Sequence, residues 1–122
     1  MNTVDMNTLD EYQLAAAAIA AGPGDNPTLE LAIFGLGIAG EAGEVADLLK
    51  KHLGHGHALD VDKLRKELGD VLWYTAMIAH RHGLALSEVA AANLHKLQKR
   101  YPNGFSSEAS QARVDELESL TR

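Results

Sequence analysis

The sequence predicts an all-α fold, a four-helix bundle, and three observations support this prediction. Apolar residues recur at three- and four-residue spacing through most of the chain, which is the period of a helix with one buried face. No segment alternates apolar and polar residues over the length of a strand. Turn-forming runs such as GPGDNP separate the periodic segments. With 122 residues, 46% of them hydrophobic, the chain is long enough for one domain with one core.

Capping signals predict where the first two helices begin. Thr8 precedes an alanine-rich segment, and Glu11, three residues further on, completes the pattern of a capping box. Asn26 followed by Pro27 predicts the second start, because asparagine caps well and the first helical position needs no backbone donor. The two helices are expected to cover residues 9–21 and 27–53.

Two further helices are expected after the loop GHGHALD. Asp60 or Asp62 is the predicted N-cap of the third helix, which should end near Gly83 because glycine is favoured just beyond a helix. Ser87 is the predicted N-cap of the fourth helix, and the PNG turn at 102–104 ends it.

The C-terminal end of the chain has a different composition. Beyond Phe105 it is polar, and a short helix is expected over residues 114–120. The predicted organisation is therefore a helical catalytic domain over residues 1–104. A tail over residues 105–122 follows, with a short helix that packs on the bundle or on a partner subunit.

The glycines of the second helix allow two interpretations. Gly35, Gly37 and Gly40 match the G-x-G-x-x-G spacing of a dinucleotide-binding turn, and Asp60 follows at about the distance of a ribose-binding acid. That fold requires a parallel sheet, and the candidate second strand, HALD, is too short. A glycine at every third position from Gly37 to Gly43 instead suits close contact with another helix. We therefore interpret these glycines as helix-packing residues.

Two pairs of acidic residues lie on apolar helix faces. At ~100° per residue, Glu41 and Glu44 lie about 60° apart and share a side with Phe34, and Glu67 and Asp70 repeat this arrangement on the third helix. An unpaired carboxylate in a core costs several kcal/mol unless something neutralises it. Mg²⁺ prefers oxygen ligands and would neutralise these carboxylates. The sequence therefore predicts a metal site, and the alternative is two solvated acidic faces.

Three polar residues share one face of the fourth helix. Asn93, Lys96 and Arg100 are three and four residues apart. Beside an acidic metal site, Lys96 and Arg100 would bind phosphate oxygens, and the arginine can donate two parallel hydrogen bonds. The alternative is that they form salt bridges with the acids.

The segments LDEYQ, GEAGEVADLLKK, ELGDVLWY and NLHKLQKRYPNGFSSEASQAR resemble the MazG-type nucleoside triphosphate pyrophosphohydrolases. These belong to the all-α NTP pyrophosphatase superfamily, with dCTP pyrophosphatases and dimeric dUTPases. The resemblance implies that Mg²⁺, for which Mn²⁺ can substitute, binds to four acids: Glu41, Glu44, Glu67 and Asp70. It also implies that Lys96 and Arg100 bind and activate the triphosphate, and that Tyr74 and Asn93 line the nucleotide pocket.

The implied reaction is (d)NTP + H₂O → (d)NMP + PPi, by attack of water on the α-phosphate. Pyrimidine or modified deoxynucleotides are the expected substrates, and house-cleaning of the nucleotide pool is the expected role. Many relatives carry an additional acid where this chain has Gly40, so the general base stays open between Glu41 and Glu44. The alternative function is a non-catalytic nucleotide sensor or a helical interaction module.

Composition narrows the partners and the location. The net charge is −6, which argues against nucleic acid and anionic membranes as partners. The first residues lack a signal-peptide pattern and no apolar run approaches the ~20 residues of a membrane span, so a cytoplasmic protein is expected. A single bundle of this kind exposes much apolar surface, so a homodimer or homotetramer is also expected.

Two other features have structural interpretations. The chain has no cysteine, so His52, His55 and His57 are expected to form a solvated loop rather than a zinc site. Trp73 points about 120° away from Glu67 and is expected to pack in the core or between subunits, not on a nucleobase.

Overall fold

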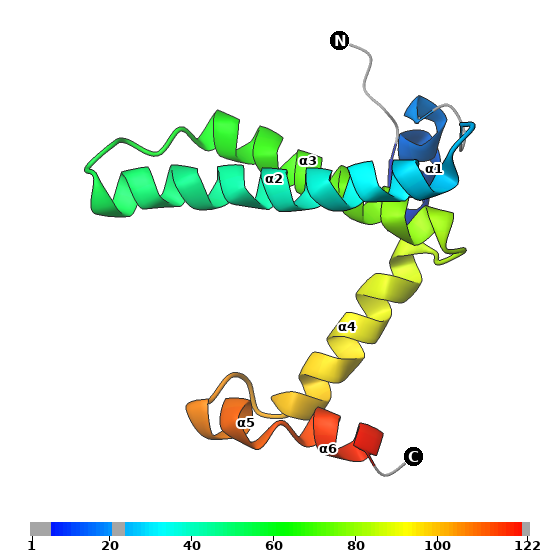
Figure 1. The fold of residues 1–122 in the computed structure, drawn as a ribbon. Coiled ribbons are helices and arrows are strands. Elements are labelled where there is room, and N and C mark those ends of the chain that lie inside the picture. The colour runs from blue at the N-terminus through cyan, green and yellow to red at the C-terminus, as the bar shows by residue number, and fades with distance from the viewer. Residues whose placement is uncertain (1–5, 21–23, 121–122) are drawn as a thin grey trace. The chain divides into compact units, whose positions relative to one another are not determined.

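The computed structural model describes residues 6–20 and 24–120. Within these residues the chain forms no strand, only one isolated bridge between Pro102 and Gly104, so the all-α prediction is confirmed. The helices are labelled in Figure 1: α1 (Leu9–Ile19), α2 (Pro27–Gly54), α3 (Val61–Arg81), α4 (Leu86–Arg100), α5 (Ser107–Ala112) and α6 (Val114–Leu120).

The chain divides into two compact units. The first ends at Leu86 and contains α1, α2 and α3, and the second begins at Ser87 and contains nearly all of α4 with α5 and α6. In the described part of the chain, no helix is both long enough and apolar enough to cross a membrane.

Side-chain caps begin the first three helices at predicted residues. The Thr8 hydroxyl accepts a hydrogen bond from the backbone N–H of Glu11 at 3.1 Å. Asn26 and Asp60 cap α2 and α3 in the same way, at 3.0 and 3.1 Å. The capping-box prediction is wrong in one respect, because the Glu11 carboxylate accepts from the N–H of Asn7, one residue before the cap. These local bonds fix the starts of the helices without help from the rest of the fold.

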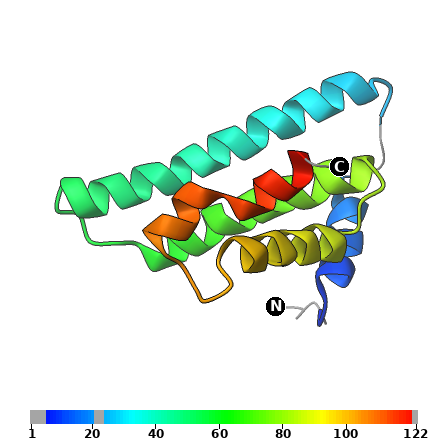
Figure 2. The ribbon, with the colours of Figure 1, turned by 90° about the horizontal axis from the view of Figure 1, so that it is seen from below.

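The helices α2 and α3 form an antiparallel hairpin, and α1 packs against α3 (Figures 1 and 2). Phe34, Trp73 and Tyr74 pack together in this unit, with Phe34 and Trp73 in an edge-to-face contact at 5.7 Å between ring centroids. The expected packing of Trp73 in the core is therefore confirmed. The buried residues of the cluster come from these three helices and from the first position of α4: Ala16, Phe34, Ala76, Met77 and Leu86.

The start of α4 depends on a distant residue. The prediction that Ser87 caps this helix is wrong, because α4 begins one residue earlier at Leu86. The N–H of Leu86 donates to Oε1 of Gln13 in α1 at 2.9 Å. The Gln13 amide, 6% exposed, donates in turn to the carbonyls of Ala76 and Leu84 at 3.2 and 3.0 Å. This acceptor lies 73 residues away, so no local capping rule could identify it.

The second unit has its own local order. The Ser106 hydroxyl caps α5 by accepting from the N–H of Ala109 at 3.1 Å. Arg113 then connects α5 to α6 with a φ of 47°, in the left-handed region. The short helix predicted over residues 114–120 is confirmed as α6, whereas α5 was not predicted.

Candidate metal centre

Three carboxylates from two helices meet on the hairpin. Glu67 and Asp70 lie on one face of α3 because they are three residues apart, and the antiparallel pairing places Glu41 of α2 opposite them. One oxygen atom from each side chain lies within 4.8 Å of the other two. Hard divalent cations such as Mg²⁺ take carboxylate oxygens of this kind as ligands.

The electrostatics of the group also suit a cation. A hydrogen bond with Glu67 raises the pKa of Glu41 to about 7, and desolvation and repulsion from Glu67, Asp70 and Glu44 act in the same direction. Two carboxyl groups this close share a proton near neutral pH when no cation is bound. Arg81 lies about three turns further along α3 than Asp70 and pairs with Glu30. A divalent ion would take the place of the shared proton.

Glu44 lies one turn beyond Glu41 and outside the three-carboxylate group, although its charge helps to raise the Glu41 pKa. The prediction that the four acids face the core is wrong, because Glu44 and Asp70 are exposed and Glu41 and Glu67 are only half-buried. The reason is the length of the hairpin. Its buried cluster, which includes Phe34, lies where α1 joins α2 and α3, and the acids lie further along α2 and α3.

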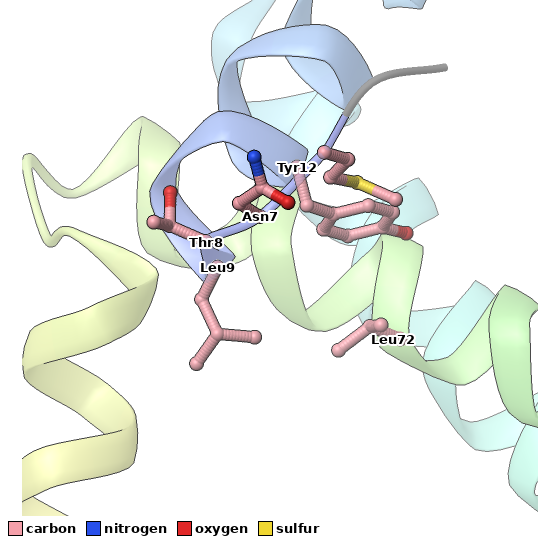
Figure 3. A pocket seen from close by; sticks show the side chains of 6 residues that line it. Asn7, Thr8, Leu9, Tyr12 and Leu72 are labelled. Carbon is pink, nitrogen blue, oxygen red and sulfur yellow. The ribbon is translucent and has the colours of Figure 1, made fainter. Parts of the chain in front are cut away.

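A small pocket lies beside the start of α1. Met6, Asn7, Thr8, Leu9, Tyr12 and Leu72 line a volume of about 300 Å³, and Figure 3 shows the Tyr12 ring above Leu72. Burial and then the charge of Asp70 raise the pKa of the Tyr12 phenol, so the Tyr12 side chain lies within electrostatic range of Asp70. Sequence pattern did not identify Tyr12, because this proximity joins helices that are distant in the chain.

Tyr74, four residues after Asp70, packs directly on Gly37. A Cβ atom added at Gly37 would lie 2.4 Å from the Tyr74 ring, which is closer than such atoms can approach. The helix-packing interpretation is therefore confirmed at Gly37. At Gly40 and Gly43 an added Cβ would meet nothing within 4 Å, so within this chain these two glycines do not make the predicted contact.

We expect Gly37→Ala to lower the free energy of unfolding by about 1–3 kcal/mol, because the Tyr74 ring must move to make room. Gly43→Ala is the matched control in the same helix. It should raise the free energy of unfolding by up to ~1 kcal/mol, since alanine is the better helix former and nothing obstructs its methyl group. Urea denaturation of both variants checks the prediction, and a stabilising Gly37→Ala substitution would contradict the contact.

The polar residues of α4 have different surroundings. Asn93 and Lys96 are exposed, whereas the Arg100 side chain is 13% exposed. The Arg100 guanidinium donates two parallel hydrogen bonds to Asp115 of α6, from Nε at 2.7 Å and from Nη2 at 2.8 Å. The carboxylate that pairs with Arg100 is thus one that sequence pattern had not singled out.

His52, His55 and His57 are all exposed, as the solvated-loop interpretation expects, but His52 lies in the last turn of α2 and only His55 and His57 follow the helix. Nδ1 of His52 lies 2.7 Å from the carbonyl oxygen of His57. Among the residues that the structure places, these histidines do not bring three ligand atoms together, whereas the acids on the hairpin do.

The helical hairpin thus carries an E-x-x-E segment in α2 and an E-x-x-D segment in α3. A model of the MazG nucleotide pyrophosphohydrolase domain matches residues 33–105, which include both acidic segments and α4. The chain belongs to this family, as its sequence motifs predicted.

A bacteriophage protein is also similar to most of the chain. The chain is similar to the Gene 37 protein of Mycobacterium phage L5, with 42% identity over 103 residues, which cover 79% of this chain and 90% of that protein. No solved structure matches the chain.

Proposed function

We propose that this protein hydrolyses nucleoside triphosphates to nucleoside monophosphates and pyrophosphate, with Mg²⁺ as the cofactor and Mn²⁺ as a substitute. The convergence of Glu41, Glu67 and Asp70 within 4.8 Å, in a member of the MazG family, is the observation that carries this proposal. The three residues offer only oxygen ligands, which fits these hard cations better than softer ones.

The chain's own residues have distinct roles in this proposal. When bound, Mg²⁺ would polarise phosphate oxygens and favour attack by water at the α-phosphorus. Glu41, Glu67 and Asp70 hold the ion. Glu44 lies beside this group rather than in it, so we assign to it the removal of a proton from the attacking water. A role for Glu44 as a fourth ligand stays a prediction.

Four residues are proposed to contact the substrate. Lys96 and Arg100 would bind phosphate oxygens, as the family resemblance implies, and Tyr74 and Asn93 would line the nucleotide pocket. The pocket beside Tyr12 is a candidate site for the base. Its volume of about 300 Å³ is large enough to hold a nucleobase.

Self-association is part of the proposal. Leu29, Ile33 and Leu36 share one face of α2 and are 55%, 53% and 74% exposed. An apolar stripe of this kind on a catalytic helix supports a homodimer or homotetramer.

The test is a panel of NTPs and dNTPs incubated with the protein and Mg²⁺, with pyrophosphate and orthophosphate measured separately. We expect pyrophosphate as the first product, with deoxypyrimidine triphosphates among the best substrates and no reaction in excess EDTA. Orthophosphate as the first product would place the attack on the terminal phosphate and contradict the proposal. Mg²⁺-dependent nucleotide binding without turnover would instead support the alternative, a nucleotide sensor.

A further inference from the structure

Two arginines of the second unit are both held by carboxylates of α6. Arg100 donates two hydrogen bonds to Asp115, whose side chain is 6% exposed. Nη1 of Arg113 lies 2.9 Å from Oε1 of Glu116, and Nη2 of Arg100 lies 3.5 Å from the same oxygen. Two guanidinium groups therefore converge on two adjacent acids.

These ion pairs are a large part of what attaches α6. The helix has seven residues, too few to be stable by itself in water. Val114 and Leu117 are 43% and 57% exposed, so the apolar side chains described in this helix contribute little burial. The helix follows directly on Arg113, whose left-handed backbone is unfavourable for a residue with a side chain. Ion pairs of this kind are released when another anion binds the arginines in place of the carboxylates.

The geometry at Arg100 is the one that phosphate would use. A guanidinium group binds carboxylate and phosphate through the same planar pair of N–H donors. Asp115 occupies both donors that face it, on Nε and Nη2, and its hydrogen bonds raise the pKa of Arg100 further above its ordinary value. While this pair is intact, Arg100 cannot offer the same two donors to a triphosphate.

We propose that α6 is an internal competitor for the substrate, in which Asp115 and Glu116 occupy Arg100 and Arg113 until a polyphosphate displaces them. The inference rests on the proposed function, because it assumes that Arg100 binds the triphosphate. It adds a regulatory contact to that site. The apparent affinity for the triphosphate is reduced by the fraction of molecules in which Arg100 is free, so weakening α6 should raise that affinity.

The experiment is calorimetric titration of the full chain with inorganic tripolyphosphate in the presence of Mg²⁺, for the unchanged protein and for Asp115→Asn. The substitution keeps the size of the side chain and removes its charge. We expect Asp115→Asn to bind tripolyphosphate about tenfold more tightly. A second substitution, Arg100→Ala, should cancel this gain in the Asp115→Asn background.

Two further variants keep the test decisive. Glu116→Gln alters a side chain that is 55% exposed, so it should fold normally, and we expect roughly two- to threefold tighter binding. Glu108→Gln is the control, because it removes the same charge from the exposed surface of α5. It should leave tripolyphosphate binding unchanged. If Asp115→Asn fails to fold, the affinity of Glu116→Gln for tripolyphosphate tests the proposal.

Equal or weaker tripolyphosphate binding by Asp115→Asn and Glu116→Gln would overturn the proposal and make these ion pairs purely structural. Because the binding measurement needs no turnover, it separates this inference from the proposed function. A protein that shows the expected change in binding but releases no pyrophosphate would contradict the proposed reaction and leave the competitor role supported.

Discussion

Asp70→Asn is expected to lower the rate of pyrophosphate release by at least about a hundredfold. The substitution preserves the shape of the side chain but removes one of three charged oxygen ligands, so the ion would be held by Glu41 and Glu67 alone. Glu67→Gln should have a comparable effect, because it also removes one of the three charged oxygen ligands. Initial rates with saturating nucleotide and a range of Mg²⁺ concentrations measure the loss.

Two further variants are needed to interpret the loss of activity in Asp70→Asn and Glu67→Gln. Asp62→Asn removes an exposed acid from the first turn of α3, where it pairs with Arg65 at the surface, and should leave the rate within about twofold. Glu44→Gln should lower the rate at saturating Mg²⁺ without weakening Mg²⁺ binding if Glu44 is the base. It should weaken Mg²⁺ binding if Glu44 is a fourth ligand. Unchanged rates in both Asp70→Asn and Glu67→Gln would show that the metal assignment is wrong.

The apparent affinity for Mg²⁺ is expected to fall roughly fiftyfold between pH 7 and pH 5. The ion and the proton compete for the same carboxylates, and the pKa of Glu41 without a cation is raised to about 7 by its hydrogen bond with Glu67. Below that pH, each unit of acidity should weaken binding almost tenfold. Calorimetric titration in buffers of different ionisation enthalpy would measure both the affinity and the proton released.

The stability of the metal-free protein should depend on pH in the opposite direction to that of most proteins. Between pH 4.5 and about 7 the folded chain binds more protons at Glu41 than the unfolded chain does. The free energy of unfolding in EDTA should therefore fall as the pH rises through this window. Lys51 and Arg100 lower the pKa of Asp47 and Asp115, so those two groups act at lower pH, where stability is lost on acidification.

Glu41→Gln is the control for this pH dependence, because it removes the proton that titrates. Its free energy of unfolding in EDTA should change less between pH 5 and pH 7 than that of the unchanged protein. A metal-free protein whose stability rises across this interval would contradict the proton shared by Glu41 and Glu67.

The helices could be predicted because their signals are local. Thr8, Asn26 and Asp60 cap helices through bonds to residues three positions away, and these bonds form in the structure as expected. The spacing of Glu67 and Asp70 also fixes their common face on α3 whatever the helix packs against. The family and the acidic residues of the candidate site could therefore be predicted from the sequence alone.

The contacts between helices could not be predicted in the same way. The pairing of α2 with α3 selects Glu41 for the three-carboxylate group and leaves Glu44 beside it, although both share one helix face in the sequence. The burial of those acids was overestimated for Glu44, since a helical period shows which residues share a face but not how far along the helix the core extends.

The sequence by itself determined the starts and caps of α1, α2 and α3 and the candidate acids, because each depends on residues within one or two turns of each other. Only the tertiary structure decided that Gln13 starts α4, that Tyr12 approaches Asp70 and that Asp115 holds Arg100. These contacts join separate helices, and their formation depends on how buried surfaces and charges pack together rather than on any spacing along the chain.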